Sequence, residues 1–335
     1  MATRRSEPAA AAHGKSHEHV HEHRRDHAHD HAHGHDHSPA DLSLTLFSPG
    51  GVVKEAAPLR LAAKRLGAIG FKVSVDESAL KKSQRFAGDD EMRLAAIHRV
   101  ATTAPGIAMA TRGGYGLTRL LDSIDWKLLG QSVEKGTRWV GHSDVTVLQL
   151  GMLAHARAPS WAGPLGCSDF GGEVVDEVTA ECFREAMTGQ LEAVGFRTEA
   201  GFDGLQERGL VWGGNLAMVN SLLGTRHMPK VKNGVLFLED VNEHPYRIER
   251  SLLQLHQAGV LDAQKAVLLG AFTDFRKSPL DRGYSLKTVV AHLRSLTKTP
   301  ILTGLPFGHI PTRISLPVGR KVTLLVDGRD VLIGW

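Results

Sequence analysis

Apolar and polar residues alternate along the chain in short blocks, and from residue 41 onward these blocks have two different periods. Four apolar runs are too short for ordinary helices and are predicted to be buried strands: 42–47, 71–75, 106–110 and 137–140. Stretches with apolar residues at helical spacing are predicted to be helices: 59–66, 89–102, 117–122 and 145–153. Strands that alternate with helices across short glycine-rich turns predict a parallel sheet covered by helices on both faces.

Three turns follow the predicted strands: Ser48–Gly51, Arg112–Gly116 and Gly141–Asp144. The carboxyl ends of parallel strands meet at one edge of the sheet, and ligands bind in the crevice beyond that edge. We therefore expect these three turns to meet at a binding site.

The second half of the chain repeats the strand and helix pattern. Strands are predicted at 235–238, ending before Glu239-Asp240, and at 266–272. Helices are predicted at 246–258, with Pro245 in the first turn, and at 286–296. The end of the chain reads as a hairpin around Asp327-Gly328. We predict an α/β fold with an N-terminal α/β domain at 41–165, a linker at 166–208, and a smaller, strand-rich C-terminal α/β domain at 209–335.

Residues 1–40 have a different composition, with 11 of the 19 histidines of the chain and few large apolar side chains. Such a segment cannot bury a core, and we expect a disordered tail. Ten of its histidines could bind a metal ion opportunistically: His17, His19, His21, His23, His27, His29, His31, His33, His35 and His37. A tail that buffers or delivers metal for a purpose is the alternative.

Composition excludes several classes of protein. The formal net charge of +4 and the lack of Lys/Arg-rich runs argue against a nucleic-acid partner. No apolar run is long enough to span a membrane, and none follows Arg4-Arg5 as in a secretory signal. The two cysteines, Cys167 and Cys182, have no metal-ligand spacing and are expected to be reduced, as in the cytoplasm. Neither a phosphate-binding P-loop nor a Gly-x-Gly-x-x-Gly motif occurs.

Ser143 lies between a predicted strand and a predicted helix, with Gly141 two residues before it. This is the context of a nucleophile elbow, in which a sharp turn exposes a catalytic serine beside the N–H groups of a helix N-terminus. A Ser-Asp pair before an apolar helix is also a common helix N-cap. The serine alone does not decide between the two interpretations.

An active serine needs a base, and the base needs an acid to orient it. Of the eight histidines after residue 40, four lie in predicted helices and two in turns, and His142 is adjacent to the serine itself. His309, in a glycine-rich loop, is the best candidate for the base. Glu239 ends an apolar strand, where it either begins a solvated loop or serves as the acid. In the order Ser, acid, His, the three residues match several hydrolases.

At these residues the chain resembles the LD-carboxypeptidase family of serine peptidases, which also contains the microcin C immunity peptidases. The matching stretches are Ser48-Pro49-Gly50, Arg112–Gly116 with Arg119-Leu120-Leu121 and Asp125-Trp126, Gly141-x-Ser143-Asp144, Gly213–Leu216, Leu238–Val241 with Pro245–Ile248, and Pro306-x-Gly308-His309. They extend over nearly the whole chain after residue 41, and their order and spacing are specific.

The resemblance implies a Ser143-Glu239-His309 triad, with the backbone N–H groups of Asp144 and Gly114 as oxyanion donors. It implies no cofactor and no metal in the folded part, a homodimer, and a site between the two domains. The implied reaction releases terminal D-alanine from a murein tetrapeptide during cytoplasmic recycling of the cell wall. Arg112 and Tyr115 are the candidates for substrate binding. His142 and Asn242 depart from the family pattern, where an aromatic residue and a glycine are common.

Two other functions remain open. An immunity-type peptidase, which cleaves a peptidyl-nucleotide antibiotic, would use the same triad and would need an aromatic platform such as Trp161 or Trp212 for the nucleobase. An inactive relative that binds metal through its tail is the second alternative.

Overall fold

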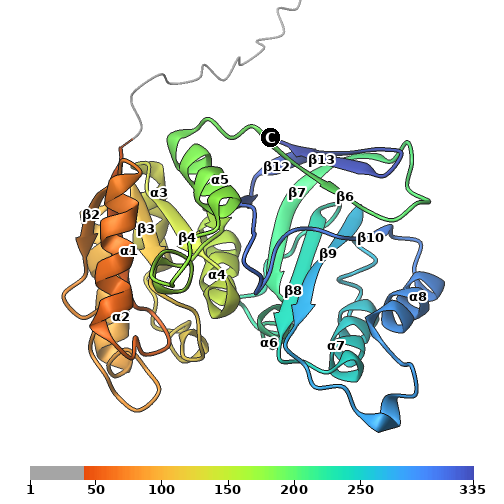
Figure 1. The fold of residues 1–335 in the computed structure, drawn as a ribbon, viewed down its shortest axis with the longest axis horizontal. Coiled ribbons are helices and arrows are strands. Elements are labelled where there is room, and N and C mark those ends of the chain that lie inside the picture. The colour runs from red at the N-terminus through yellow and green to blue at the C-terminus, as the bar shows by residue number, and fades with distance from the viewer. Residues whose placement is uncertain (1–40) are drawn as a thin grey trace, which may run out of the picture. The chain divides into compact units, whose positions relative to one another are not determined.

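The computed structural model describes residues 41–335, so the predicted tail and its metal-binding histidines lie outside the described residues. Within the described residues, two sheets with flanking helices make a mixed α/β fold (Figure 1). In this part of the chain, no helix is both long and apolar enough to cross a membrane.

The first sheet has six strands and carries the serine. In spatial order they are β11 (Leu316–Val318), β5 (Ser160–Ala162), β4 (Arg138–Gly141), β3 (Ile107–Ala110), β1 (Ser43–Phe47) and β2 (Lys72–Val75). All neighbouring strands are parallel except β11, which pairs antiparallel with β5. The predicted parallel sheet is thus confirmed, with one antiparallel edge strand added from far along the chain.

Helices cover both faces of this sheet, as the alternation of side chains along its strands requires. Leu44 and Leu46 of β1 share a buried cluster with α1 (Ala56–Ala68) and α5 (Glu177–Thr188). Phe47 belongs to a second cluster with α2 (Asp90–Thr103), α3 (Trp126–Glu134) and α4 (Thr146–Ala156). The two clusters bury nearly every apolar side chain of the central strands.

The second sheet has seven strands and carries the glutamate. Their order is β10 (Ile301–Thr303), β9 (Ala266–Thr273), β8 (Val235–Val241), β7 (Gln206–Asn215), β12 (Lys321–Asp327), β13 (Asp330–Gly334) and β6 (Ala193–Arg197). The first four are parallel and the last three pair antiparallel. Three further helices belong to this half: α6 (Leu216–Ser221), α7 (Pro245–Gln257) and α8 (Leu286–Leu296). In Figure 1 this sheet lies beside the first, with α4 between them in contact with β7.

Two predicted elements are wrong in their bounds. The strand predicted to end before Glu239 continues to Val241, because a β-bulge between Leu238 and Asp240 keeps the chain in the sheet. The helix predicted at 117–122 is only a single 3₁₀ turn, Leu117–Arg119. The structure also adds β5, β6, β7, β10 and β11; of these, β5, β10 and β11 have three residues each, too few for a periodic pattern. The division into two domains and a linker stays a prediction.

Candidate active site

Ser143 lies immediately beyond the end of β4. A single 3₁₀ turn, Ser143–Val145, leads from it into α4. The φ angle of Ser143 is +62°, a left-handed conformation that costs a non-glycine residue about 1–2 kcal/mol. A Cβ atom added at Gly141 would lie 2.9 Å from Val145 Cγ1, so only glycine allows this tight turn.

Gly113 touches the serine from the neighbouring turn. A Cβ atom at Gly113 would lie 2.7 Å from the Cβ of Ser143 and 2.9 Å from its Oγ. The Gly51 N–H donates to the Gly113 carbonyl at 3.2 Å, which joins the turn after β1 to the turn after β3. The three turns predicted to meet beyond the sheet therefore do so.

Glu239 and His309 form a hydrogen-bonded pair. His309 Nδ1 lies 2.8 Å from Glu239 Oε2, and the other carboxylate oxygen accepts from Asn215 Nδ2 at 3.2 Å. Glu239 is fully buried, whereas the His309 side chain is 24% exposed. Because the carboxylate accepts from Nδ1–H, the Nε2 atom of the neutral ring is left with a lone pair that can accept a proton.

The pKa of His309 reflects two opposing effects. Burial disfavours the charged imidazolium, but the hydrogen bond and the negative charge of Glu239 outweigh it, and the pKa is raised above its ordinary value. The glycine before the histidine makes this contact possible. Gly308 has a φ of +133°, and a Cβ atom there would lie 3.1 Å from Glu239 Cβ.

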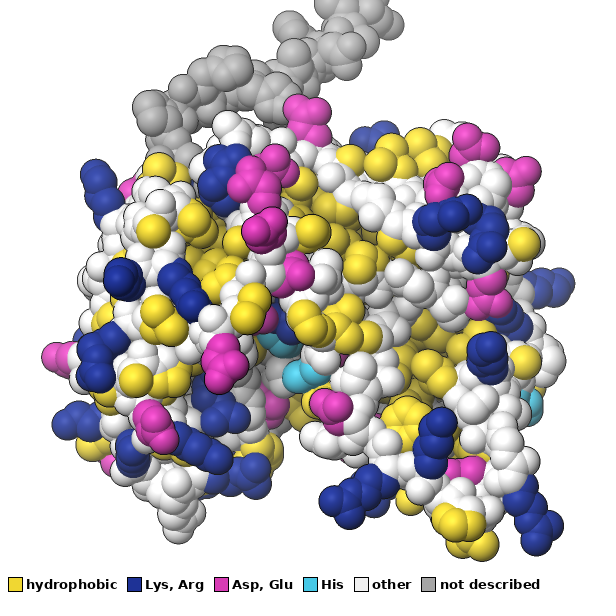
Figure 2. Space-filling model, in the orientation of Figure 1, with side chains coloured by type: hydrophobic (Ala, Val, Ile, Leu, Met, Phe, Trp, Pro, Cys, Tyr) yellow, Lys and Arg dark blue, Asp and Glu magenta, His cyan; other side chains and the backbone are white. Residues whose placement is uncertain are grey.

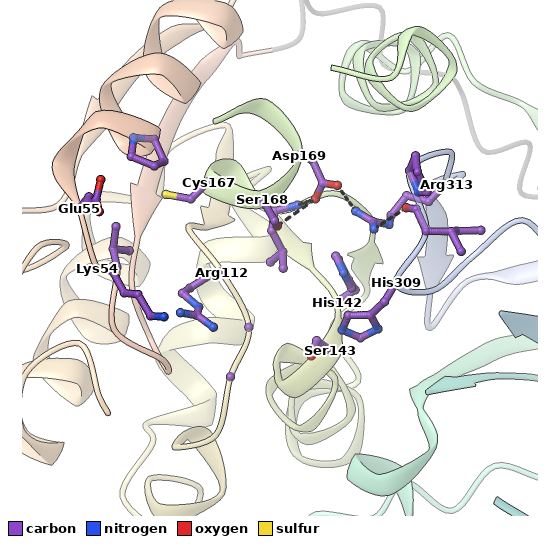
Figure 3. Close-up of a pocket in the computed structure, with 17 residues that line it drawn as sticks. Lys54, Glu55, Arg112, His142, Ser143, Cys167, Ser168, Asp169, His309 and Arg313 are labelled. Atoms are coloured by element: carbon purple, nitrogen blue, oxygen red, sulfur yellow. Dashed lines mark hydrogen bonds and ion pairs between the residues drawn. The ribbon is translucent and has the colours of Figure 1, made fainter. Parts of the chain in front are cut away.

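A cavity of about 750 Å³ is lined by both Ser143 and His309. Figure 2 shows a hollow in the middle of one face, with histidine side chains inside it. In Figure 3, Ser143 and His309 lie side by side at one end of the cavity, and Lys54 and Arg112 line the other end. Among the described residues the Ser143 hydroxyl donates to Asp144 Oδ2, at 3.4 Å, and not to the imidazole.

One of the two predicted oxyanion donors has a hydrogen-bond partner within the chain. The Gly114 N–H donates to Asp144 Oδ2 at 3.2 Å. Burial raises the pKa of the Asp144 carboxyl, and the hydrogen bond from Gly114 acts in the opposite direction. One of the two N–H groups that the resemblance implies is therefore already occupied in the free protein.

The two predicted substrate-binding residues differ in position. Arg112 lines the cavity, and its Nη1 donates to the carbonyl of Val52 at 2.9 Å, which fixes the side chain. Tyr115 does not line the cavity; its ring is 45% exposed and lies against Phe86, with a centroid separation of 6.0 Å.

The two departures from the family pattern have structural explanations. His142 is buried, its Nδ1–H donates to the Gly163 carbonyl at 2.9 Å, and its ring meets that of His309 edge-on at 5.2 Å. Burial lowers the pKa of His142 well below its ordinary value, so the ring stays neutral, as an aromatic side chain would be. Asn242 has a φ of +61°, a conformation that glycine adopts freely and asparagine tolerates.

Sequence reasoning missed four residues of this region. Lys54 lines the cavity, Asn215 binds Glu239, and Arg313 and Asp169 form an ion pair at the cavity wall. Asn215 had a signal, since it closes the glycine-rich stretch Gly213–Leu216. The other three had none, because their roles depend on contacts between distant parts of the chain.

Two residues considered for a nucleobase platform are unsuited to it. Trp161 is only 5% exposed, and Trp212 is fully buried with its indole N–H donating to Gln264. Neither lines the cavity. Within residues 41–335, no group of three or more His, Cys, Asp or Glu side chains is arranged to hold a metal ion.

Comparison with known proteins identifies the class. Residues 44–163 match the model of the LD-carboxypeptidase N-terminal domain, and residues 208–324 match that of the C-terminal domain. These matches define a serine peptidase. The chain belongs to the LD-carboxypeptidase family, and its activity is that of a serine-type LD-carboxypeptidase.

Three relatives illustrate the range of the family. The murein tetrapeptide carboxypeptidase of Pseudomonas aeruginosa is 28% identical over 304 residues, which cover 85% of this chain and 94% of that protein. The crystal structure of muramoyltetrapeptide carboxypeptidase from Oxalobacter formigenes is similar with a TM-score of 0.80 and 38% identity, covering 88% of this chain and 99% of that one. The microcin C7 self-immunity protein of Escherichia coli is 25% identical over 256 residues, covering 67% and 72%.

Proposed function

We propose that this protein hydrolyses the amide bond that joins an L-centre to the terminal D-alanine of a murein tetrapeptide. The observation that carries the proposal is the Glu239–His309 hydrogen bond of 2.8 Å, whose histidine lines the same cavity as Ser143. The named substrate of the Pseudomonas aeruginosa relative supports the choice of peptide.

Ser143 is the nucleophile in this proposal, exposed on a nucleophile elbow. Its Oγ attacks the carbonyl carbon of the peptide while His309 Nε2 takes the hydroxyl proton. Glu239 holds the imidazole in the required tautomer and stabilises the imidazolium. When the C–N bond breaks, His309 gives the proton to the leaving D-alanine amine, and a water molecule then hydrolyses the acyl-enzyme ester by the same path.

The oxyanion forms against the backbone N–H groups of Asp144 and Gly114. Each such donor contributes roughly 2.7–4 kcal/mol to transition-state stabilisation in serine peptidases. Because the Gly114 N–H is bound to Asp144 Oδ2 in the free protein, the Asp144 side chain must rotate away as the oxyanion develops.

A free carboxylate at the end of the substrate calls for a cation. Arg112 is the proposed partner, since its Nη1 is fixed by Val52 and its guanidinium lines the cavity. Lys54 lines the same wall and adds a second positive charge. Glu55 lines the same end with a negative charge, so the three side chains together leave one positive charge for a single substrate carboxylate.

The test is incubation of the purified protein with murein tetrapeptide and assay of the released D-alanine. Release by the wild type and its loss in Ser143→Ala are expected. Release that survives this substitution, or that a chelator alone abolishes, would overturn the proposal.

The setting of the reaction is also proposed from the family resemblance. It consists of a homodimer in the cytoplasm that serves recycling of cell-wall peptides, with no nucleic-acid, membrane or cofactor partner. Sedimentation analysis tests the dimer, and fractionation of the producing cells tests the location.

The immunity-type activity is the second candidate, because the microcin C7 self-immunity protein is a relative. The burial of Trp161 and Trp212 removes both side chains considered for stacking on a nucleobase, which favours the murein peptide. Assay of a peptidyl-nucleotide beside the tetrapeptide separates the two.

A further inference from the structure

Arg313 has an unusual set of hydrogen bonds around the proposed base. Its side chain is only 5% exposed. Its Nε donates to the carbonyl of Gly308 at 3.0 Å, and its Nη2 donates to the carbonyl of Ile310 at 2.8 Å. These two carbonyls belong to the residues on either side of His309. One guanidinium therefore binds the backbone immediately before and immediately after this histidine.

The third nitrogen connects this loop to the half of the molecule that carries the serine. Arg313 Nη1 forms an ion pair with Asp169, whose side chain is 10% exposed. The other carboxylate oxygen of Asp169 accepts from the Leu165 N–H at 2.7 Å. The Cys167 N–H donates to the Thr111 carbonyl at 2.7 Å, which ties this segment to the end of β3. Figure 3 shows the Arg313–Asp169 pair beside His142 and His309.

A second contact fixes the same loop. The Arg313 backbone N–H donates to Thr179 Oγ1 at 2.8 Å, and that hydroxyl donates to the Pro311 carbonyl at 3.0 Å. The loop between Gly308 and Arg313 is thus attached to α5 as well as to the Asp169 segment. His309 itself takes part in none of these hydrogen bonds. The loop is therefore held in place independently of the hydrogen bond between His309 and Glu239.

Only arginine satisfies all three acceptors. Its guanidinium presents five N–H donors in one rigid plane, whereas a lysine ammonium is a single charged point on a flexible stem. A buried cation is costly without a partner, and Asp169 supplies it. The ion pair with Asp169 does not cancel the effect of Arg313 on the site. The positive charge of Arg313 acts to lower the pKa of His309, against the larger effect of Glu239.

We propose that Arg313, anchored by Asp169, is the positioning residue of the proposed general base: it fixes the backbone on both sides of His309 so that the imidazole stays between Glu239 and Ser143. This inference rests on the proposed function, since it assigns Arg313 a role only if His309 is the base. Arg313 touches no reacting atom and acts through His309 alone.

Two substitutions separate geometry from charge. Arg313→Lys keeps the positive charge but loses the planar set of N–H donors that binds three acceptors. We expect kcat to fall by about 10²-fold with little change in KM, since a displacement of the His309 imidazole by about 1 Å has that cost. The acid limb of kcat/KM should stay in place. Arg313→Met removes the charge as well, so kcat should fall at least as far and the acid limb should move to higher pH.

Arg294 offers a matched control. Its guanidinium also donates hydrogen bonds both to the Glu199 carboxylate and to the Ile301 carbonyl, but it lies away from the cavity. Arg294→Met should lower thermal stability and leave the pH profile of kcat/KM unchanged. Added guanidinium should restore part of the activity of Arg313→Ala, because this truncation leaves space for the ion at a position that lines the cavity.

The outcomes are distinguishable from failure of the proposed function. If the wild type releases D-alanine and Ser143→Ala does not, but folded Arg313→Lys keeps the wild-type kcat, the positioning role is wrong. If the wild type releases none, NMR of the His309 Nδ1–H in the wild type and in Arg313→Lys decides. A weakened hydrogen bond to Glu239 in the variant supports the positioning role, and an unchanged Nδ1–H resonance overturns it. Should Arg313→Met fail to fold, Asp169→Asn, with a similar loss of kcat expected, takes its place.

Discussion

At the scale of single residues, the site depends on a buried carboxylate with no free acceptor. Glu239 is fully buried and uses one oxygen for His309 and the other for Asn215. An unpaired charge in this position would cost several kcal/mol, so the two partners stabilise the ionised form. The same pairing fixes which nitrogen of His309 is free to accept a proton.

The pH dependence of the reaction should follow the raised pKa of His309. The imidazolium cannot accept the serine proton, so activity is lost at low pH and rises as pH increases through this pKa. Since Glu239 raises it, the acid limb of kcat/KM should lie above pH 6.5, the ordinary value for histidine. A profile of kcat/KM between about pH 5 and 9 checks this, and a midpoint below the ordinary value would contradict it.

Replacing Glu239 by glutamine should reverse this effect. The amide has no charge to raise the pKa, so the acid limb should move to lower pH. It also permits the wrong imidazole tautomer, and kcat should fall by about 10⁴-fold, as for the corresponding acid of other triads. Steady-state kinetics measure both changes; a variant with near wild-type kcat would remove Glu239 from the mechanism.

At the scale of elements, the site depends on turns that only glycine permits. The turn after β3 passes so close to Ser143 that a methyl group at Gly113 has no space. The turn is also tied to the end of β1 through the Gly51 N–H. The serine therefore has little freedom to move aside.

Gly113→Ala should consequently displace Ser143 and lower kcat by about 10²-fold or more. The cost in stability should be about 1–3 kcal/mol, as for overpacking elsewhere. Gly67→Ala is the matched control, because a Cβ atom there meets nothing within 4 Å and the residue lies in α1. It should stabilise the fold by about 0.5–1 kcal/mol and leave kcat unchanged. Equal kinetics for both variants would refute the close contact.

The elements that sequence could predict are those with a local pattern. β1, β3 and β4 are apolar runs bounded by glycine or by a turn, and α1, α2 and α7 have helical spacing. The bulge that extends β8 beyond Glu239 has no local sequence pattern, because it depends on the register between β8 and β9. β11 is three residues long and pairs with β5 across nearly half of the chain. Arg313 could not be predicted for a similar reason, since its carboxylate partner Asp169 comes from a distant segment.

At the scale of the whole molecule, the residues among 41–335 that line the cavity lie between Val53 and Arg313 and include both Ser143 and His309. Deleting residues 1–40 should therefore leave kcat and KM for murein tetrapeptide unchanged, while removing ten of the histidines considered for metal binding. Kinetics and Ni²⁺ titration of the truncated and full chains test this. Loss of activity on deletion would favour the alternative in which the tail carries the function.

The pairing of β11 with the first sheet determines when that sheet can be completed during synthesis of the chain. The chain passes between the sheets three times, from β5 to β6, from β10 to β11, and from β11 to β12. Since β11 follows β5 by about 150 residues, it is synthesised long after β5, and until then β5 has an unpaired edge. The loop with His309 is part of the second passage. The proposed base and the closing strand of the first sheet are therefore synthesised together, long after the serine.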